Sequence, residues 1–233
     1  MADAKASSPL PLLLLLLSLT TGLVDAASVL GLGKVFTANM TGNVVFLGFA
    51  IAGTPGFTVG PFIVALVTFM AGALLAGRIG KSLAGLPLRR WLLTAAVVEA
   101  ALLWGAAAIA IGFDIAGQAP RWALYAIIAA TAVAMGFRNG TIRQLKVPDL
   151  TTTVLTLTIT GIAADSTLAG GSNPNWGRRI GSVVAILGGA AIGALLVTRT
   201  GSLVAPLALA GALVLVGTAL CAALPGATEP AKP

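Results

Sequence analysis

Six long apolar runs constrain the possible folds of this chain more than any other feature of its sequence. Five of them are roughly 16 to 23 residues long, the length of an α-helix that crosses a hydrocarbon core of about 30 Å. A shorter, leucine-rich run stands near the N-terminus. The six runs are residues 10–24, 61–77, 91–113, 122–137, 180–198 and 202–224. With 58% hydrophobic and 9% charged residues, they predict an all-α integral membrane protein with a single transmembrane domain in residues 1–233.

The residue types that the chain lacks exclude several kinds of active site. There is no histidine, so Ser-His or Cys-His catalysis and histidine-ligated zinc are excluded. The single cysteine, Cys221, cannot form an internal disulfide. The sequence also contains no H-E-x-x-H or G-x-S-x-G motif. We therefore expect no enzymatic activity, no metal and no cofactor.

The net charge of +7 does not by itself indicate nucleic-acid binding. The basic residues lie between apolar segments and lack interleaved aromatic residues. Basic residues of membrane proteins collect in cytoplasmic loops, which is the simpler explanation. We expect the lipid bilayer as a partner and no nucleic acid.

The N-terminus has two interpretations. Lys5, the leucines at 12–17 and the sequence Val24-Asp25-Ala26 are typical of a cleaved signal peptide. Alternatively, residues 10–24 form a retained first span that ends near Asp25. An internal repeat favours the retained span.

Three matches in the same order indicate this repeat. G-L-V-D-A-A-S aligns with G-F-R-N-G-T-I, which puts Asp25 on Asn139 at an offset of 114 (139 − 25). The Thr41 region falls on the Thr156 region at an offset of 115 (156 − 41). The third match aligns A-G-A-L-L-A-G-R-I-G with I-G-A-L-L-V-T-R-T-G, which puts Arg78 on Arg199 at an offset of 121 (199 − 78). Chance could produce any one match, but all three favour a duplication, with repeat one at 10–113, repeat two at 119–224 and a cytoplasmic tail at 225–233.

Each half contains three spans and a short segment, 37–52 or 151–164, that either crosses the membrane or re-enters it. If both segments are re-entrant, 11 of the 14 Lys and Arg residues lie on the cytoplasmic side; if both cross, the number is 9. The positive-inside rule therefore favours re-entrant segments. Three spans per half is an odd number, so the second half is inverted relative to the first. The sequence thus predicts two inverted three-span repeats: six transmembrane helices plus two short re-entrant or broken helices.

Two polar clusters mark the short segments, at F-T-A-N-M-T-G-N and D-L-T-T-T-V-L-T. If the first segment turns near Thr41-Gly42-Asn43, the run 44–52 leaves as a short helix, and Asp149 or Thr151 caps the second. Both helices would present backbone N–H groups and a positive dipole end toward the membrane centre. This favours a substrate site for an anionic solute; a cation bound by hydroxyls and carbonyls, or simple helix packing, is the alternative. The candidate substrate-binding residues are Asn39, Thr41, Gly42, Asn43, Thr151, Thr152, Thr153 and Thr156.

Charged and amide residues inside apolar segments are candidates for structural or coupling roles. Glu99 lies mid-span and is either a proton carrier or the partner of an Arg or a Trp N–H. Asp25 and Asn139 could brace the broken segments, and Asp25 could pair with Lys34. Arg138, like Arg143 and Lys146, most simply enforces orientation, or forms an anion-attracting vestibule.

The stretches G-L-V-D-A-A-S-V-L, F-T-A-N-M-T-G-N-V-V-F-L-G and V-P-D-L-T-T-T-V-L-T resemble the YoaK-type family of bacterial inner-membrane proteins, a family of unknown function. The resemblance implies a multi-pass protein with about six spans in the bacterial inner membrane. It brings no substrate, cofactor or catalytic residue. In that pattern a Gln precedes the Asn at 139, whereas this chain has Arg138, and an added charge beside the site would alter selectivity.

From these observations we expect a small-solute transporter or channel with both termini in the cytoplasm. Its small size and glycine-rich helix faces favour a homodimer. The alternative is a non-transporting scaffold or partner subunit, in which the polar clusters pack dry against neighbouring helices.

Overall fold

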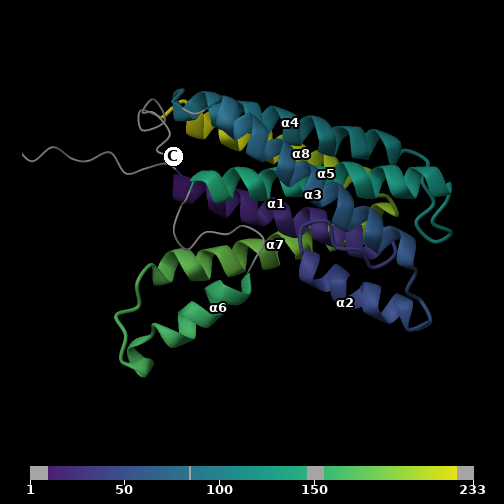
Figure 1. Cartoon of the computed structure of the whole chain (residues 1–233), viewed down its shortest axis with the longest axis horizontal. Coiled ribbons are helices and arrows are strands. Elements are labelled where there is room, and N and C mark those ends of the chain that lie inside the picture. Colours follow the sequence, from purple (N-terminus) through teal and green to yellow (C-terminus); the bar gives the residue numbers. More distant parts are fainter. Residues whose placement is uncertain (1–9, 84, 146–154, 225–233) are drawn as a thin grey trace, which may run out of the picture.

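The computed structural model describes residues 10–83, 85–145 and 155–224. The regular elements of these residues are all helical (Figure 1). In chain order they are α1 (Leu10–Gly31), α2 (Met40–Ile51), α3 (Val59–Ser82), α4 (Leu88–Ile109), α5 (Arg121–Leu145), α6 (Leu155–Ala164), the 3-10 helix η1 (Thr167–Ala169), α7 (Trp176–Thr200) and α8 (Val204–Ala222).

The prediction of six membrane-spanning helices and two short ones is confirmed. The helices α1, α3, α4, α5, α7 and α8 are long and apolar enough to span a bilayer, whereas α2 and α6 are too short. The first span is longer than its leucine run: α1 continues to Gly31, beyond Asp25, because small and apolar residues follow that carboxylate. The predicted tail at 225–233 lies outside the described residues.

The long helices pack in pairs along stripes of glycine. α1 lies along α7, α3 along α5 and α4 along α8. A Cβ atom on Gly22 or Gly189 would overlap the backbone of the facing helix in the first pair, and one on Gly72 or Gly136 would do so in the second. Gly193 also faces the α1 backbone, so Gly189 and Gly193 both serve close helix packing.

The directions of the helices show that neither short helix changes sides of the bundle. Contacts such as Leu15 with Gly181 and Leu23 with Gly193 make α1 and α7 parallel, and Gly60 with Tyr125 and Gly80 with Gln144 do the same for α3 and α5. α8 runs antiparallel to α1 and α4, and α4 runs antiparallel to α5. Consequently α1 ends on the side where α3 begins, and α5 ends on the side where α7 begins. α2 and α6 are therefore re-entrant, as the charge count predicted.

The packing pairs support the predicted inverted repeat but favour a different register for one match. A two-fold relation between the two halves would equate α1 with α5 and α3 with α7. The packing of α1 against α7 then corresponds to the packing of α5 against α3, and both pairs are present. Gly189 contacts Leu19 as Gly72 contacts Val133, which equates Gly72 with Gly189 at an offset of 117 (189 − 72). The predicted alignment of Gly72 with Gly193 is one helical turn away, because G-A-L-L recurs easily in such helices.

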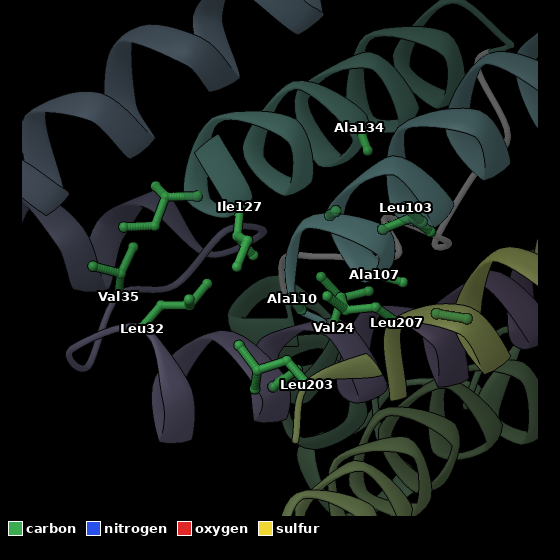
Figure 2. Close-up of a cluster of buried hydrophobic side chains, with 14 of the residues drawn as sticks. Val24, Leu32, Val35, Leu103, Ala107, Ala110, Ile127, Ala134, Leu203 and Leu207 are labelled. Atoms are coloured by element: carbon green, nitrogen blue, oxygen red, sulfur yellow. The ribbon is translucent and has the colours of Figure 1, made fainter. Parts of the chain in front are cut away.

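A core of small and branched side chains holds the chain that follows α1. Leu32 and Val35, just beyond the end of α1, are buried with Ile127 of α5 and Leu103 of α4 (Figure 2). Leu203, at the start of α8, closes the same cluster. The connection from α1 to α2 is thus packed into protein rather than exposed to lipid.

Replacing Gly136 by Ala tests the close packing of α3 and α5. The new methyl group would meet the carbonyl oxygen of Phe69, and such overpacking costs about 1–3 kcal/mol, so we expect a lower unfolding temperature in detergent. Gly188→Ala is the matched control, because a Cβ there meets nothing within 4 Å. Equal unfolding temperatures for the two variants would contradict the described helix pairing.

Candidate functional site

The chain between α1 and α2 turns back into the bundle and is braced there by Asn43. The Asn43 side chain is fully buried; its Oδ1 accepts the Phe36 N–H at 2.9 Å, and its Nδ2 donates to the Phe36 carbonyl oxygen. One amide thereby satisfies both backbone groups of a residue that belongs to no helix. In hydrocarbon such groups need partners within the protein.

Asp25 supplies the second brace. Its Oδ1 accepts the backbone N–H of Ala38 at 3.0 Å, and the Thr37 N–H also faces this carboxylate. This contact with the Ala38 N–H is the kind of bracing predicted for Asp25. The predicted pairing with Lys34 is wrong: the Lys34 ammonium lies over the Phe57 ring, 4.6 Å from its centroid.

The start of α2 differs from the sequence-based prediction. The helix begins at Met40, so Thr41, Gly42 and Asn43 form its first turn rather than a bend. Gly42 is needed for its small size: a Cβ would touch the Phe36 ring. Asn39 occupies the N-cap position, but its side chain makes no capping hydrogen bond.

A cluster of phenylalanines attaches α2 to α3. The Phe46 ring lies 5.2 Å from that of Phe57 and 6.0 Å from that of Phe62, measured between centroids. Phe36 stacks on the Phe46 ring, and Phe49 contacts it at a tilt. Aromatic pairs of this geometry each add about 0.5–1.5 kcal/mol beyond area burial, and they fix where the first turn of α2 points.

The first turns of α2 and α6 share one cavity. Figure 1 shows the two short helices on the same side of the bundle, with their first turns facing each other. Between them lies a cavity of about 400 Å³. Its lining residues come from α1, α7 and both short helices: Thr21, Gly22, Asp25, Phe36, Asn39, Thr41, Gly42, Leu155, Thr156, Ile186 and Ala190.

The cavity sits midway along the long helices. Thr21 and Gly22 are at the centre of α1, and Ile186 and Ala190 flank the centre of α7. Thr21 and Asp25 are four residues apart and so share a helix face. Hydroxyl, amide and carboxylate groups are therefore brought together at half the depth of the bundle.

The predicted site residues fall into three groups. Asn39, Thr41, Gly42 and Thr156 line the cavity, together with Asp25. Asn43 is a structural brace, and Thr151, Thr152 and Thr153 lie outside the described residues. Glu99 and Asn139 are not among the lining residues; the Asn139 amide donates to the Met135 carbonyl on its own helix at 2.8 Å.

Sequence reasoning missed six lining residues: Thr21, Gly22, Phe36, Leu155, Ile186 and Ala190. Thr21 sits in a run that resembles any apolar span, but its four-residue spacing from Asp25 was a usable signal. Phe36 precedes the polar cluster, and its position depends on the fold of the re-entrant chain.

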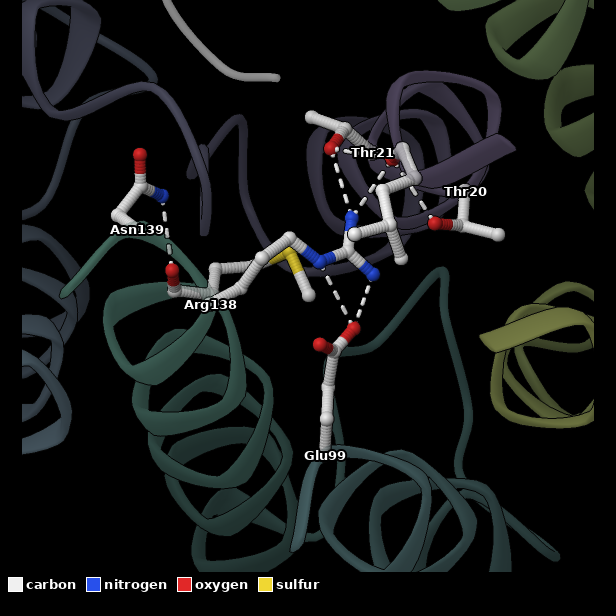
Figure 3. Close-up of polar contacts among 7 residues, drawn as sticks. Thr20, Thr21, Glu99, Arg138 and Asn139 are labelled. Atoms are coloured by element: carbon white, nitrogen blue, oxygen red, sulfur yellow. Dashed lines mark hydrogen bonds and ion pairs between the residues drawn. The ribbon is translucent and has the colours of Figure 1, made fainter. Parts of the chain in front are cut away.

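A buried ion pair lies beside the cavity (Figure 3). The Arg138 guanidinium of α5 donates to Glu99 Oε1 of α4 through Nε at 2.8 Å and also through Nη2. Its Nη1 donates to the Leu17 carbonyl oxygen and to Thr21 Oγ1 on α1, both at 2.8 Å. One side chain thus connects three spans, and both charged residues are almost completely buried.

This pair corrects the prediction for Arg138. Arg138 is neither a loop residue that sets orientation nor part of a vestibule, because it is 2% exposed within α5. Of the two roles predicted for Glu99, the one found is the partner of an arginine. A carboxylate at mid-membrane costs at least about 2.5 kcal/mol, which the guanidinium offsets.

A second ion pair holds the other re-entrant hairpin. Arg179 Nη1 of α7 lies 2.7 Å from Asp165 Oδ2, just after α6. The same guanidinium lies against Gly161 of α6, where a side chain would collide with it. Asp165 is therefore an interface residue between this hairpin and α7.

The fold and site define a multi-pass α-helical membrane protein with two re-entrant helices around a central polar cavity. Over residues 13–220 the chain matches the family described as "Protein of unknown function (DUF1275)". The chain belongs to this family, which confirms the resemblance seen in the sequence motifs.

One curated relative is the UPF0700 transmembrane protein YoaK of Bacillus subtilis (strain 168). It is 34% identical over 154 residues, which cover 66% of this chain and 65% of the Bacillus protein, so slightly less than two thirds of that protein is matched. No solved structure matches the chain.

The Arg138–Glu99 pair can be tested by a double-mutant cycle. Removing one partner leaves the other charge buried and unpaired, so Arg138→Gln and Glu99→Gln should each lower the free energy of unfolding by about 3–5 kcal/mol. The double variant should lose much less than the sum of the two, as measured by denaturation in mixed micelles. Strictly additive losses would contradict a direct pair.

Proposed function

We propose that this protein is a small-solute membrane transporter or channel whose substrate site is the cavity between α2 and α6. The observation that carries the proposal is the shared lining: residues from the first turns of both short helices border one cavity of about 400 Å³. That volume falls within the usual range of ligand sites, about 300–1,000 Å³. Re-entrant helices that meet at mid-depth are a recurring construction of secondary transporters.

The helix ends favour an anionic solute. The first backbone N–H groups of α2 have no partners within that helix, and the N-terminal ends of α2 and of the described part of α6 border the cavity. The hydroxyls of Thr41 and Thr156 add donors on opposite sides. Asn39 adds an amide that is not engaged in capping.

The orientation and setting follow from the charge distribution. We place both termini in the cytoplasm and the chain in the bacterial inner membrane as a pair of inverted three-span repeats. Assembly as a homodimer and the absence of catalysis are parts of the same proposal. A scaffold without transport is the competing function.

Flux through reconstituted liposomes tests the proposal. Liposomes containing the protein should admit at least one of potassium nitrate, formate or acetate, with valinomycin present, faster than protein-free liposomes do in a light-scattering assay. Thr41→Val and Thr156→Val should each slow this flux about ten-fold, because each removes a hydrogen-bond donor to the solute.

Thr198→Val is the matched control, because Thr198 bonds within α7 and does not line the cavity. Its flux and unfolding temperature should equal those of the unmodified protein. The scaffold would be favoured if the wild-type protein carried no flux and Thr41→Val and Thr156→Val lost stability.

A further inference from the structure

The cavity carries one charge of its own. Among its described lining residues only Asp25 is ionisable, and the others are small, apolar, hydroxyl or amide residues. Asp25 is half-buried, with Oδ1 held by the Ala38 N–H. An uncompensated carboxylate here would repel the anion that the helix ends attract.

The neighbouring cations do not neutralise Asp25. Arg138 acts on it through space, but the same guanidinium is in direct contact with Glu99. Two carboxylates therefore share one guanidinium. Lys34 is directed to the Phe57 ring instead. Among the described residues around the cavity, one negative charge is in excess, and excess charge is costly at this depth.

The lining supplies the ligands that a hard cation requires. Thr41 and Thr156 offer hydroxyl oxygens, and Asn39 offers an amide oxygen, around the Asp25 carboxylate. Alkali and alkaline-earth ions prefer such oxygen ligands. A single carboxylate neutralises a monovalent ion, whereas a divalent ion would leave a net positive charge at mid-membrane.

We infer that the cavity binds a monovalent metal cation at Asp25, and that this cation compensates the carboxylate so that an anionic solute can occupy the same cavity. The second part rests on the proposed transport function; the cation site itself does not. The two ions then enter and leave together, which makes cation binding a requirement for solute binding.

Sodium is the probe for the test. Purified full-length protein in detergent should bind ²²Na⁺ saturably, approaching one ion per chain, and its unfolding temperature should rise in NaCl relative to choline chloride. Asp25→Asn should abolish both effects while keeping an acceptor for the Ala38 N–H. Asp165→Asn is the control, because it removes a carboxylate that lies outside the cavity, and it should still bind sodium.

A measurement on the unmodified protein keeps the inference testable if Asp25→Asn does not fold. A hydrophobic carbodiimide should label Asp25 in choline chloride, as read by peptide mass spectrometry, and NaCl should protect it. No saturable sodium binding, sodium binding that Asp25→Asn retains, or labelling that NaCl does not change would overturn the inference. Stability that responds to pH but not to sodium would make the ligand a proton and would overturn it too.

The outcomes separate this inference from the proposed function. Solute flux that depends on Thr41 but proceeds equally in sodium and choline salts leaves a transporter without the cation site. Sodium binding that depends on Asp25, with no solute flux, leaves the cation site without the transporter.

Discussion

The structure depends on how the chain between α1 and α2 reverses direction inside the bundle. Non-helical backbone at membrane depth is tolerated only where protein or a polar cavity satisfies its hydrogen bonds. Asn43 satisfies both groups of Phe36, and Asp25 receives the Ala38 N–H. These two side chains fix the first turn of α2, and that turn forms one wall of the cavity.

The same requirement explains why polar residues lie close together here. Asp25 can brace the loop only if it remains inside the bundle, and its charge then becomes part of the cavity. Arg138 and Glu99 form a second polar layer directly beside it, tied to α1 through Thr21. Thr21 belongs to both layers, because it accepts from Arg138 and lines the cavity. The polar groups that brace the fold and those that line the cavity are thus adjacent, and Thr21 and Asp25 belong to both sets.

The sequence predicted the architecture well because hydrocarbon limits the choices. Length and hydropathy identified six spans, and the distribution of Lys and Arg favoured two segments that do not cross. It also predicted that Asn39, Thr41, Gly42 and Thr156 lie close together, and all four line the same cavity. Details that depend on tertiary contacts were not predictable: Asn43 looked like a ligand because an amide in an apolar segment has the same appearance in either role. Arg138 looked like a loop charge because Glu99, its partner, is 39 residues away in sequence.

The central claim is that the first turns of α2 and α6 face one cavity, and cysteine cross-linking measures it most directly. In a Cys221→Ser background, Thr41→Cys and Thr156→Cys would be introduced together, treated with short bifunctional thiol reagents, and analysed by peptide mass spectrometry. The account predicts an efficient cross-link between these positions and none when Thr198→Cys replaces Thr156→Cys. Failure of the first pair to react, or equal reaction of both pairs, would contradict the shared cavity.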